Sequence, residues 1–196
     1  MTEPIRVTYI GELGWALHVP TVHAVQVYDQ LVEAGKEFGL RHAGLQTLSS
    51  LRLEKAYRDF GLDVDNTDNP IEAGLGFAVK LHKEGGFIGR DALAAIKKKG
   101  IPCNRMLQFL LKNSDPLLHG NELIYLNGEA VGYIQIGAYG HALGAAVGIG
   151  FAGIEVPLTA DIVNNEKWEI DIAGQRFAAQ ASLRPLYDAT MKRIKC

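Results

Sequence analysis

The sequence is poor in cysteine, has no excess of either charge and contains no long apolar run. Its 196 residues include 20 basic and 22 acidic side chains, which give a net charge of −2. A nucleic-acid-binding surface needs clustered positive charge, so we expect no nucleic-acid partner. No apolar run approaches the length of a membrane-spanning helix, and the N-terminus lacks the apolar core of a signal peptide. We expect no membrane partner and a cytoplasmic location, or an organellar one without its presequence.

Patterns for disulfides and metal ions are also missing. The two cysteines, Cys103 and Cys196, fit neither a disulfide framework nor the spacing of a zinc site, which favours a reducing compartment. His119 and His141 lie beside glycines and have no cysteine or carboxylate partner at a fixed ligand spacing. We therefore predict no metal site.

The chain does have enough apolar residues, 47%, for a sizeable core, and its hydrophobic period changes near residue 100. We predict an α+β fold, with a partial α/β domain over residues 1–100 and an antiparallel β-barrel over residues 101–196. The expected helices are 21–38, 43–55 and 87–99. The expected barrel strands are 105–112, 122–126, 130–136, 144–151, 168–172 and 176–183. Asn127-Gly128, between two of these strands, is a strong hairpin signal.

The most informative stretch is 7–20, VTYIGELGWALHVP, which we predict to form a strand, a tight turn and a second strand. Gly11 and Gly14 flank Glu12 and allow a sharp bend, so that the carboxylate points away from the sheet. Charged residues are common in exposed turns, so the spacing alone is also consistent with a hairpin that has no function.

Four stretches resemble, in the same order, the aminomethyltransferase family: the glycine-cleavage T-protein and the folate-binding tails of dimethylglycine and sarcosine dehydrogenases. They are Tyr9-x-Gly-Glu-x-Gly, the helix GLQTLSSLRLE that begins at Gly44, the segment NPIEAGLGF that begins at Asn69, and the barrel phrases that begin at Pro116 and Gly128. Leu48 stands where T-proteins usually carry an arginine. This departure, with Lys55-Ala-Tyr-Arg, is more typical of the dehydrogenase branch.

The resemblance implies a site for tetrahydrofolate. It assigns the pterin ring to Glu12, whose carboxylate can accept two parallel hydrogen bonds from an aminopyrimidine-like edge, and it makes Tyr9 and Arg52 further candidates for cofactor binding. Arg52 and Glu54 are equally consistent with an ion pair within a helix or between helices. We predict no catalytic residue, because the family's aspartate near the reacting folate nitrogen belongs to an N-terminal segment that we expect to be absent here.

Two functions of different classes stay open. The first is tetrahydrofolate-dependent transfer of a one-carbon (aminomethyl) unit from a small amine, by a fragment or subunit of a larger enzyme. It predicts Glu12 in a reachable cleft. The second is a non-catalytic folate-binding or protein-interaction module, which predicts Glu12 in a salt bridge and an exposed apolar surface. Because an incomplete fold exposes apolar surface, we expect a homodimer or an N-terminal partner half.

Overall fold

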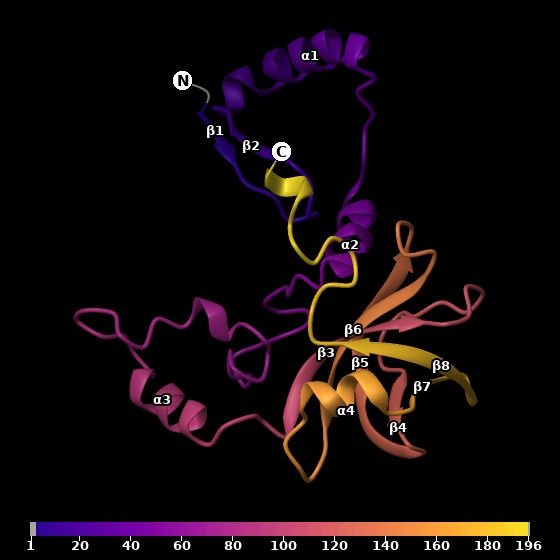
Figure 1. Cartoon of the computed structure of the whole chain (residues 1–196). Helices are drawn as coiled ribbons and strands as arrows, with labels where there is room; N and C mark the ends of the chain where they lie inside the picture. The colour runs from indigo at the N-terminus through magenta and orange to yellow at the C-terminus, as the bar shows by residue number, and fades with distance from the viewer. Residues whose placement is uncertain (1–2, 196) are drawn as a thin grey trace.

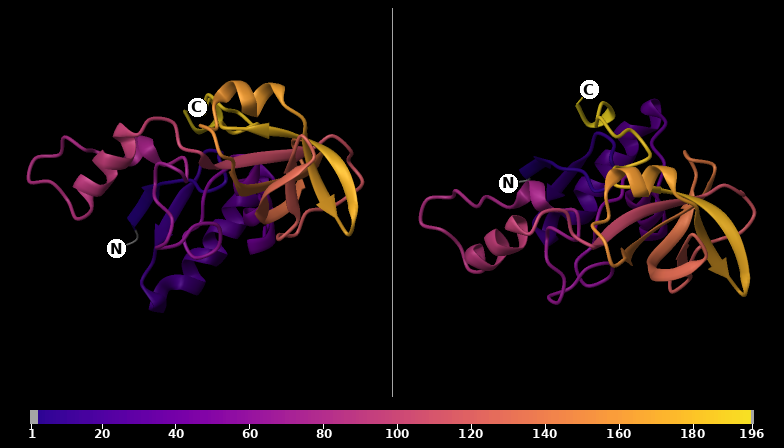
Figure 2. Two further views of the ribbon diagram at one scale, coloured as in Figure 1. Left: turned by 90° about the horizontal axis from the view of Figure 1, so that it is seen from below. Right: turned by 60° about the horizontal axis from the view of Figure 1, so that its bottom comes forward.

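The computed structural model of the chain describes residues 3–195, so the prediction for Cys196 lies outside it. A closed barrel forms the C-terminal part, and a thin hairpin and a helix near the N-terminus stand apart from it (Figure 1). Helix α2 (Leu45–Glu54) and the final C-terminal segment run between these parts (Figure 1). Helix α3 (Arg90–Lys98) lies on an arm that projects from the barrel in both views of Figure 2. The predicted α+β class is confirmed.

The barrel contains six antiparallel strands in the order β3-β6-β5-β4-β7-β8, and β8 pairs with β3 to close it. The strands are β3 (Asn104–Leu111), β4 (Leu123–Leu126), β5 (Glu129–Gly140), β6 (Ala145–Gly153), β7 (Trp168–Ile172) and β8 (Gln175–Ser182). The expected alternation on β3 is present: Leu107, Phe109 and Leu111 belong to the barrel core. Asn127 and Gly128 have φ values of 51° and 94°, as the predicted tight hairpin turn requires.

A short helix, α4 (Ala160–Asn165), was not expected from the sequence. The hydroxyl of Thr159 caps it by accepting a hydrogen bond from the backbone N–H of Ile162 at 3.3 Å. Val163 of this helix is buried in the barrel core. The helix therefore extends the core beyond the strands.

In the N-terminal hairpin the first strand is shifted toward the N-terminus relative to our prediction, whereas the second strand lies within the predicted stretch. The two strands are β1 (Glu3–Arg6) and β2 (Trp15–His18). The first strand expected within residues 7–10 and the tight turn after it are therefore wrong: residues 7–14 form one irregular loop. The hydroxyl of Thr8 accepts hydrogen bonds from the backbone N–H groups of Ile10 and Gly11, at 3.3 and 3.1 Å, which bends the chain out of strand geometry.

The helices lie close to their predicted positions, but few of their side chains are buried. The helix expected over 21–38 is present as η1 (Thr21–His23), α1 (Ala24–Gly35) and η2 (Lys36–Phe38), and short 3-10 turns also occur at η3 (Gly76–Ala78) and η4 (Arg193–Lys195). The three-residue spacing of Leu45, Leu48 and Leu51 predicts an inward-facing stripe on α2, but Leu45 is 84% exposed and the other two leucines are only partly buried. Only the last turn of α2 is buried, through Arg52, Leu53 and Glu54, since this end alone lies against the barrel. None of the helices within residues 3–195 has the length and apolar character needed to cross a membrane.

Candidate functional site between the hairpin loop and the C-terminal segment

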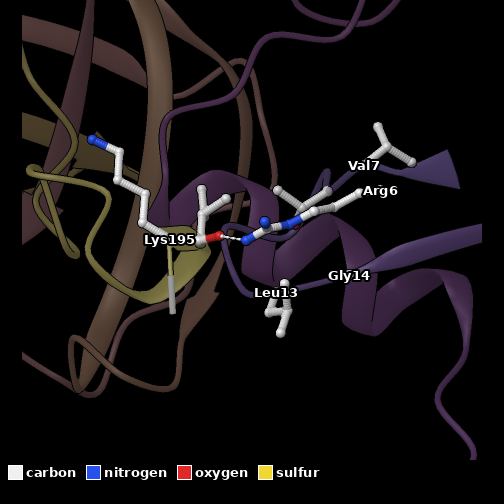
Figure 3. A pocket seen from close by; sticks show the side chains of 7 residues that line it. Arg6, Val7, Leu13, Gly14 and Lys195 are labelled. Carbon is white, nitrogen blue, oxygen red and sulfur yellow. Dashed lines mark hydrogen bonds between the residues drawn. The ribbon is translucent and has the colours of Figure 1, made fainter.

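The predicted site lies where the hairpin loop, residues 7–14, meets the C-terminal segment, residues 183–195. The guanidinium of Arg6, at the end of β1, donates a hydrogen bond to the backbone oxygen of Ile194 at 2.7 Å (Figure 3). Beside this bond is a pocket of about 500 Å³, lined by Leu13 and Gly14 of the loop and by Lys195 (Figure 3). The two ends of the described chain are thus joined side by side.

Glu12 is held by two side chains of the C-terminal segment. The Tyr187 hydroxyl donates a hydrogen bond to Glu12 Oε1 at 2.6 Å, and Arg193 Nη1 lies 3.6 Å from Glu12 Oε2. The Glu12 side chain nevertheless keeps 33% of its surface exposed. The carboxylate is therefore fixed in direction and remains reachable from solvent.

Glycine is required at both positions that flank Glu12, but for a different structural reason at each. Gly11 has a φ of +79°, and a Cβ built on it would lie 2.2 Å from Cγ of Lys55. A Cβ on Gly14 would lie 2.9 Å from the backbone oxygen of Val7, on the opposite side of the loop. The loop can therefore approach α2 at Gly11 and close on itself at Gly14 only without side chains at these positions.

Lys55, at the end of α2, connects the hairpin loop to the C-terminal segment. Its side chain is fully buried, and Nζ donates to the backbone oxygen of Asp188 at 2.8 Å and lies 3.4 Å from Asp188 Oδ2. Burial acts to raise the pKa of Asp188, but the backbone N–H groups of Lys192 and Arg193 and the Lys55 ammonium outweigh it and lower the pKa overall. The carboxylate of Asp188 thus stays charged and organises the turn that carries Arg193.

Tyr9 lies on the other side of the same loop. Its ring stacks on Tyr57, with centroids 6.0 Å apart, and its hydroxyl donates to the backbone oxygen of Arg58 at 3.0 Å. Burial is the main cause that raises the pKa of Tyr9. Both rings line a pocket of about 460 Å³ that also includes Lys55 and Met191. This pocket offers a flat aromatic wall beside a buried cation.

Arg52 is brought into the interior and not into this pocket. Its guanidinium forms a two-pronged ion pair with Asp63, whose Oδ1 lies 3.0 Å from Nη2, and Nη1 also donates to the backbone oxygen of Tyr57 at 2.9 Å. Both charged side chains are almost completely buried. Arg52 therefore forms an ion pair, but its partner Asp63 lies in a turn after α2, so the pair is neither within a helix nor between helices as the alternative predicted. The cofactor-binding role of Arg52 stays a prediction that the observed contacts do not favour.

Glu54 and Gln108 attach the end of α2 to the barrel, and Gln108 was not among the site residues predicted from the sequence. Glu54 Oε1 accepts hydrogen bonds from the N–H groups of Ala142 and Leu143, at 2.7 and 3.1 Å. Gln108 Nε2 donates to the backbone oxygens of Leu53 and Glu54, at 2.6 and 3.1 Å, and its Oε1 accepts from Leu186 N at 2.8 Å. A glutamine within an apolar strand is the sequence signal for such a clamp.

The contact between Tyr187 and Glu12 is expected to weaken at high pH. The hydrogen bond to Glu12 is the largest cause that raises the Tyr187 pKa above its ordinary value of 10.0. Folding therefore favours the protonated phenol. The stabilisation is complete below the ordinary value and is lost as pH rises through the raised pKa.

The pKa of Tyr187 can be measured from the difference in tyrosinate absorbance between the wild-type chain and Tyr187→Phe during an alkaline titration. Glu12→Gln should lower the Tyr187 pKa, because the amide carries no negative charge. An unchanged pKa in Glu12→Gln would contradict the observed pairing.

Comparison with known proteins defines the class to which this fold and site belong. The family model described as "GCVT N-terminal domain" matches residues 4–83, and the "Glycine cleavage T-protein C-terminal barrel domain" matches residues 104–188. The chain belongs to the aminomethyltransferase (glycine cleavage T-protein) family. The glycine cleavage system aminomethyltransferase T from Bartonella henselae has the same fold, with a TM-score of 0.78 at 22% identity over 94% of this chain and 49% of that one.

Two curated relatives place the chain among longer proteins. The 4-methylaminobutanoate oxidase (formaldehyde-forming) of Paenarthrobacter nicotinovorans is 39% identical over 97% of this chain and 22% of its own length. The mitochondrial pyruvate dehydrogenase phosphatase regulatory subunit of Mus musculus is 37% identical over 93% of this chain and 22% of its length. The chain thus spans about a fifth of the length of each of these relatives.

Proposed function

We propose that this chain contributes a tetrahydrofolate-binding site, centred on Glu12, to an enzyme that transfers a one-carbon unit from a small amine. The observation that carries the proposal is the geometry of Glu12, a reachable carboxylate fixed by Tyr187 and Arg193 in a chain of this family. A carboxylate offers about four acceptor positions. Tyr187 and Arg193 therefore leave room for the two parallel N–H donors of a pterin edge.

The side chains around Glu12 are suited to holding and orienting the cofactor. When bound, tetrahydrofolate supplies the nitrogen that accepts the one-carbon unit. Glu12 would fix the orientation of the pterin ring, and the stacked rings of Tyr9 and Tyr57 supply an aromatic wall nearby. The contribution to rate would come from proximity and orientation, with no catalytic side chain assigned to this chain.

Replacing Glu12 with glutamine tests this proposal. The amide keeps the shape of the carboxylate but removes its charge and one acceptor oxygen, so we expect the affinity for reduced tetrahydrofolate to fall by about tenfold or more. Anaerobic isothermal titration calorimetry of both proteins measures this change. Glu33→Gln is the matched control, because Glu33 is an exposed helical carboxylate paired only locally with Lys36.

The titration also separates this function from the alternative. Saturable binding with the same affinity in Glu12→Gln would remove Glu12 from the site. Absence of binding to the wild-type chain would contradict the folate proposal for this chain and favour a non-catalytic interaction module. That second function is favoured by the similarity to the phosphatase regulatory subunit, by the Glu12–Arg193 ion pair and by the exposed apolar residues of the N-terminal part.

A further inference from the structure

The hairpin β1–β2 presents apolar side chains on both of its faces. Directly paired residues lie on the same face of an antiparallel sheet, so the register Arg6↔Trp15 and Ile5↔Ala16 places Trp15 and Ile5 on opposite faces. Leu17, two residues from Trp15, shares its face. Trp15 is 60% exposed, Ile5 44% and Leu17 41%. A sheet with apolar side chains on both faces is suited to being buried between two layers of other elements.

The same hairpin also has unpaired edges. Within residues 3–195, β1 and β2 pair only with each other. An isolated two-stranded sheet is marginally stable in water, and its outer edges present backbone groups that can pair with further strands. The hairpin therefore has the properties of the middle of a larger sheet.

Helix α1 has an apolar face that the described chain leaves exposed. Val25, Tyr28 and Leu31 follow helical spacing on this face, and their exposed fractions are 73%, 55% and 45%. No residue of α1 is buried, and the helix packs mainly against the short turns at its two ends. Among residues 3–195, the two buried apolar clusters are built from residues at or after Leu53. Figure 1 shows α1 and the hairpin standing away from the barrel that contains these clusters.

We propose that β1–β2 and α1 form a docking surface for the complementary half of an aminomethyltransferase-type fold, which adds strands to the hairpin and covers its two faces and the apolar face of α1. The occupant is the polypeptide equivalent to the part of aminomethyltransferase T that this chain does not cover. It is linked to this chain or supplied as a separate subunit.

The comparisons and the geometry favour this occupant. The docking surface lies within residues 4–83, which match the N-terminal domain of the family, and the chain covers only 49% of the aminomethyltransferase T chain. A remainder of similar size is large enough to supply both strands and covering layers. A second copy of this chain fits less well, because two hairpins packed face to face would each leave one apolar face exposed. This inference concerns the assembly of the fold and does not depend on folate binding.

A chimera tests the proposal. The full chain replaces its matching segment in the Paenarthrobacter nicotinovorans oxidase, and amide hydrogen exchange is compared between the chimera and the isolated chain. We expect exchange in peptides covering 3–18 and 24–35 to slow by roughly tenfold or more in the chimera. The β7–β8 hairpin, at residues 168–182, is the internal reference and should not change.

Two variants make the test specific. Leu17→Glu in the chimera should abolish the slowing, whereas Leu123→Glu should not, because Leu123 is similarly exposed, at 46%, but lies on β4 of the barrel. A soluble chimera with unchanged exchange in both peptides would overturn the proposal. So would an insoluble chimera beside a soluble parent oxidase, because the surface would then not fit the complementary half. A homodimer of the isolated chain that already protects these peptides would identify a second copy as the occupant and would also overturn it.

Discussion

Replacing Arg52 with methionine is expected to lower the free energy of unfolding by about 3–5 kcal/mol. Methionine fills a similar volume but leaves the carboxylate of Asp63 buried without its partner. The side chains of Arg52 and Asp63 are only 1% and 0% exposed to solvent, so water cannot replace the lost contact. Removing Arg52 also leaves the backbone oxygen of Tyr57 without the 2.9 Å hydrogen bond that it accepts. Urea denaturation followed by circular dichroism measures the change.

The double variant Arg52→Met/Asp63→Leu separates the penalty of an unpaired charge from the value of the pair. Removing both charges should restore much of the lost stability, because a buried ion pair gains little over an apolar pair of the same volume. The exposed pair Lys36–Glu33 is the control, and Lys36→Met should change stability by less than about 1 kcal/mol. If Arg52→Met were as stable as the wild type but bound folate more weakly, the ligand-binding role predicted from the family would replace the structural one.

The barrel could be predicted because its signals are local. Alternation on β3 assigns Leu107 and Phe109 to the core, and the structure places both there. Strand β7 (Trp168–Ile172) occupies the predicted residues, and Asn127-Gly128 forms the expected turn. In each case the period of two and the turn residues determine where the strand or turn lies and which face is buried, whereas pairings such as β3 with β6 and β4 with β7 join strands that are distant in sequence.

The site could be predicted only in part, because its remaining contacts are distant in sequence. The Gly-Glu-x-Gly motif identified the loop, but the Tyr187 hydroxyl that binds Glu12 lies 175 positions away, and no spacing rule connects them. Helix α2 was assigned a buried leucine face on periodicity, yet its last turn buries Arg52 and Glu54. Their partners, Asp63 and the N–H groups near Ala142, come from other elements, and these contacts make the burial of the charges possible.

Replacing Gly11 with alanine is the second change with a large expected effect, a loss of about 3 kcal/mol of stability. A left-handed φ costs a residue with a Cβ about 1–2 kcal/mol, and overlap in a tightly packed site costs about 1–3 kcal/mol more. The overlap here is with Lys55, whose Cγ, Cδ and Cε would lie 2.2, 2.3 and 2.7 Å from the new Cβ. Lys55 has little freedom to move, because it is fully buried and its ammonium is bonded to Asp188. Urea denaturation measures the loss.

Gly39→Ala is the matched control, because Gly39 has a similar φ of +71° but, beyond its two chain neighbours, no atom of the described residues lies within 4 Å of a built Cβ. It should show the backbone cost alone, and the difference between the two variants measures the close approach of the loop to Lys55. Equal losses would mean that the loop can move away from α2 without penalty. The expected larger loss for Gly11 would explain why a glycine precedes Glu12. Only a residue without a side chain lets the loop pack on Lys55, and Lys55 in turn holds Asp188, which organises the turn that carries Arg193 to the Glu12 carboxylate.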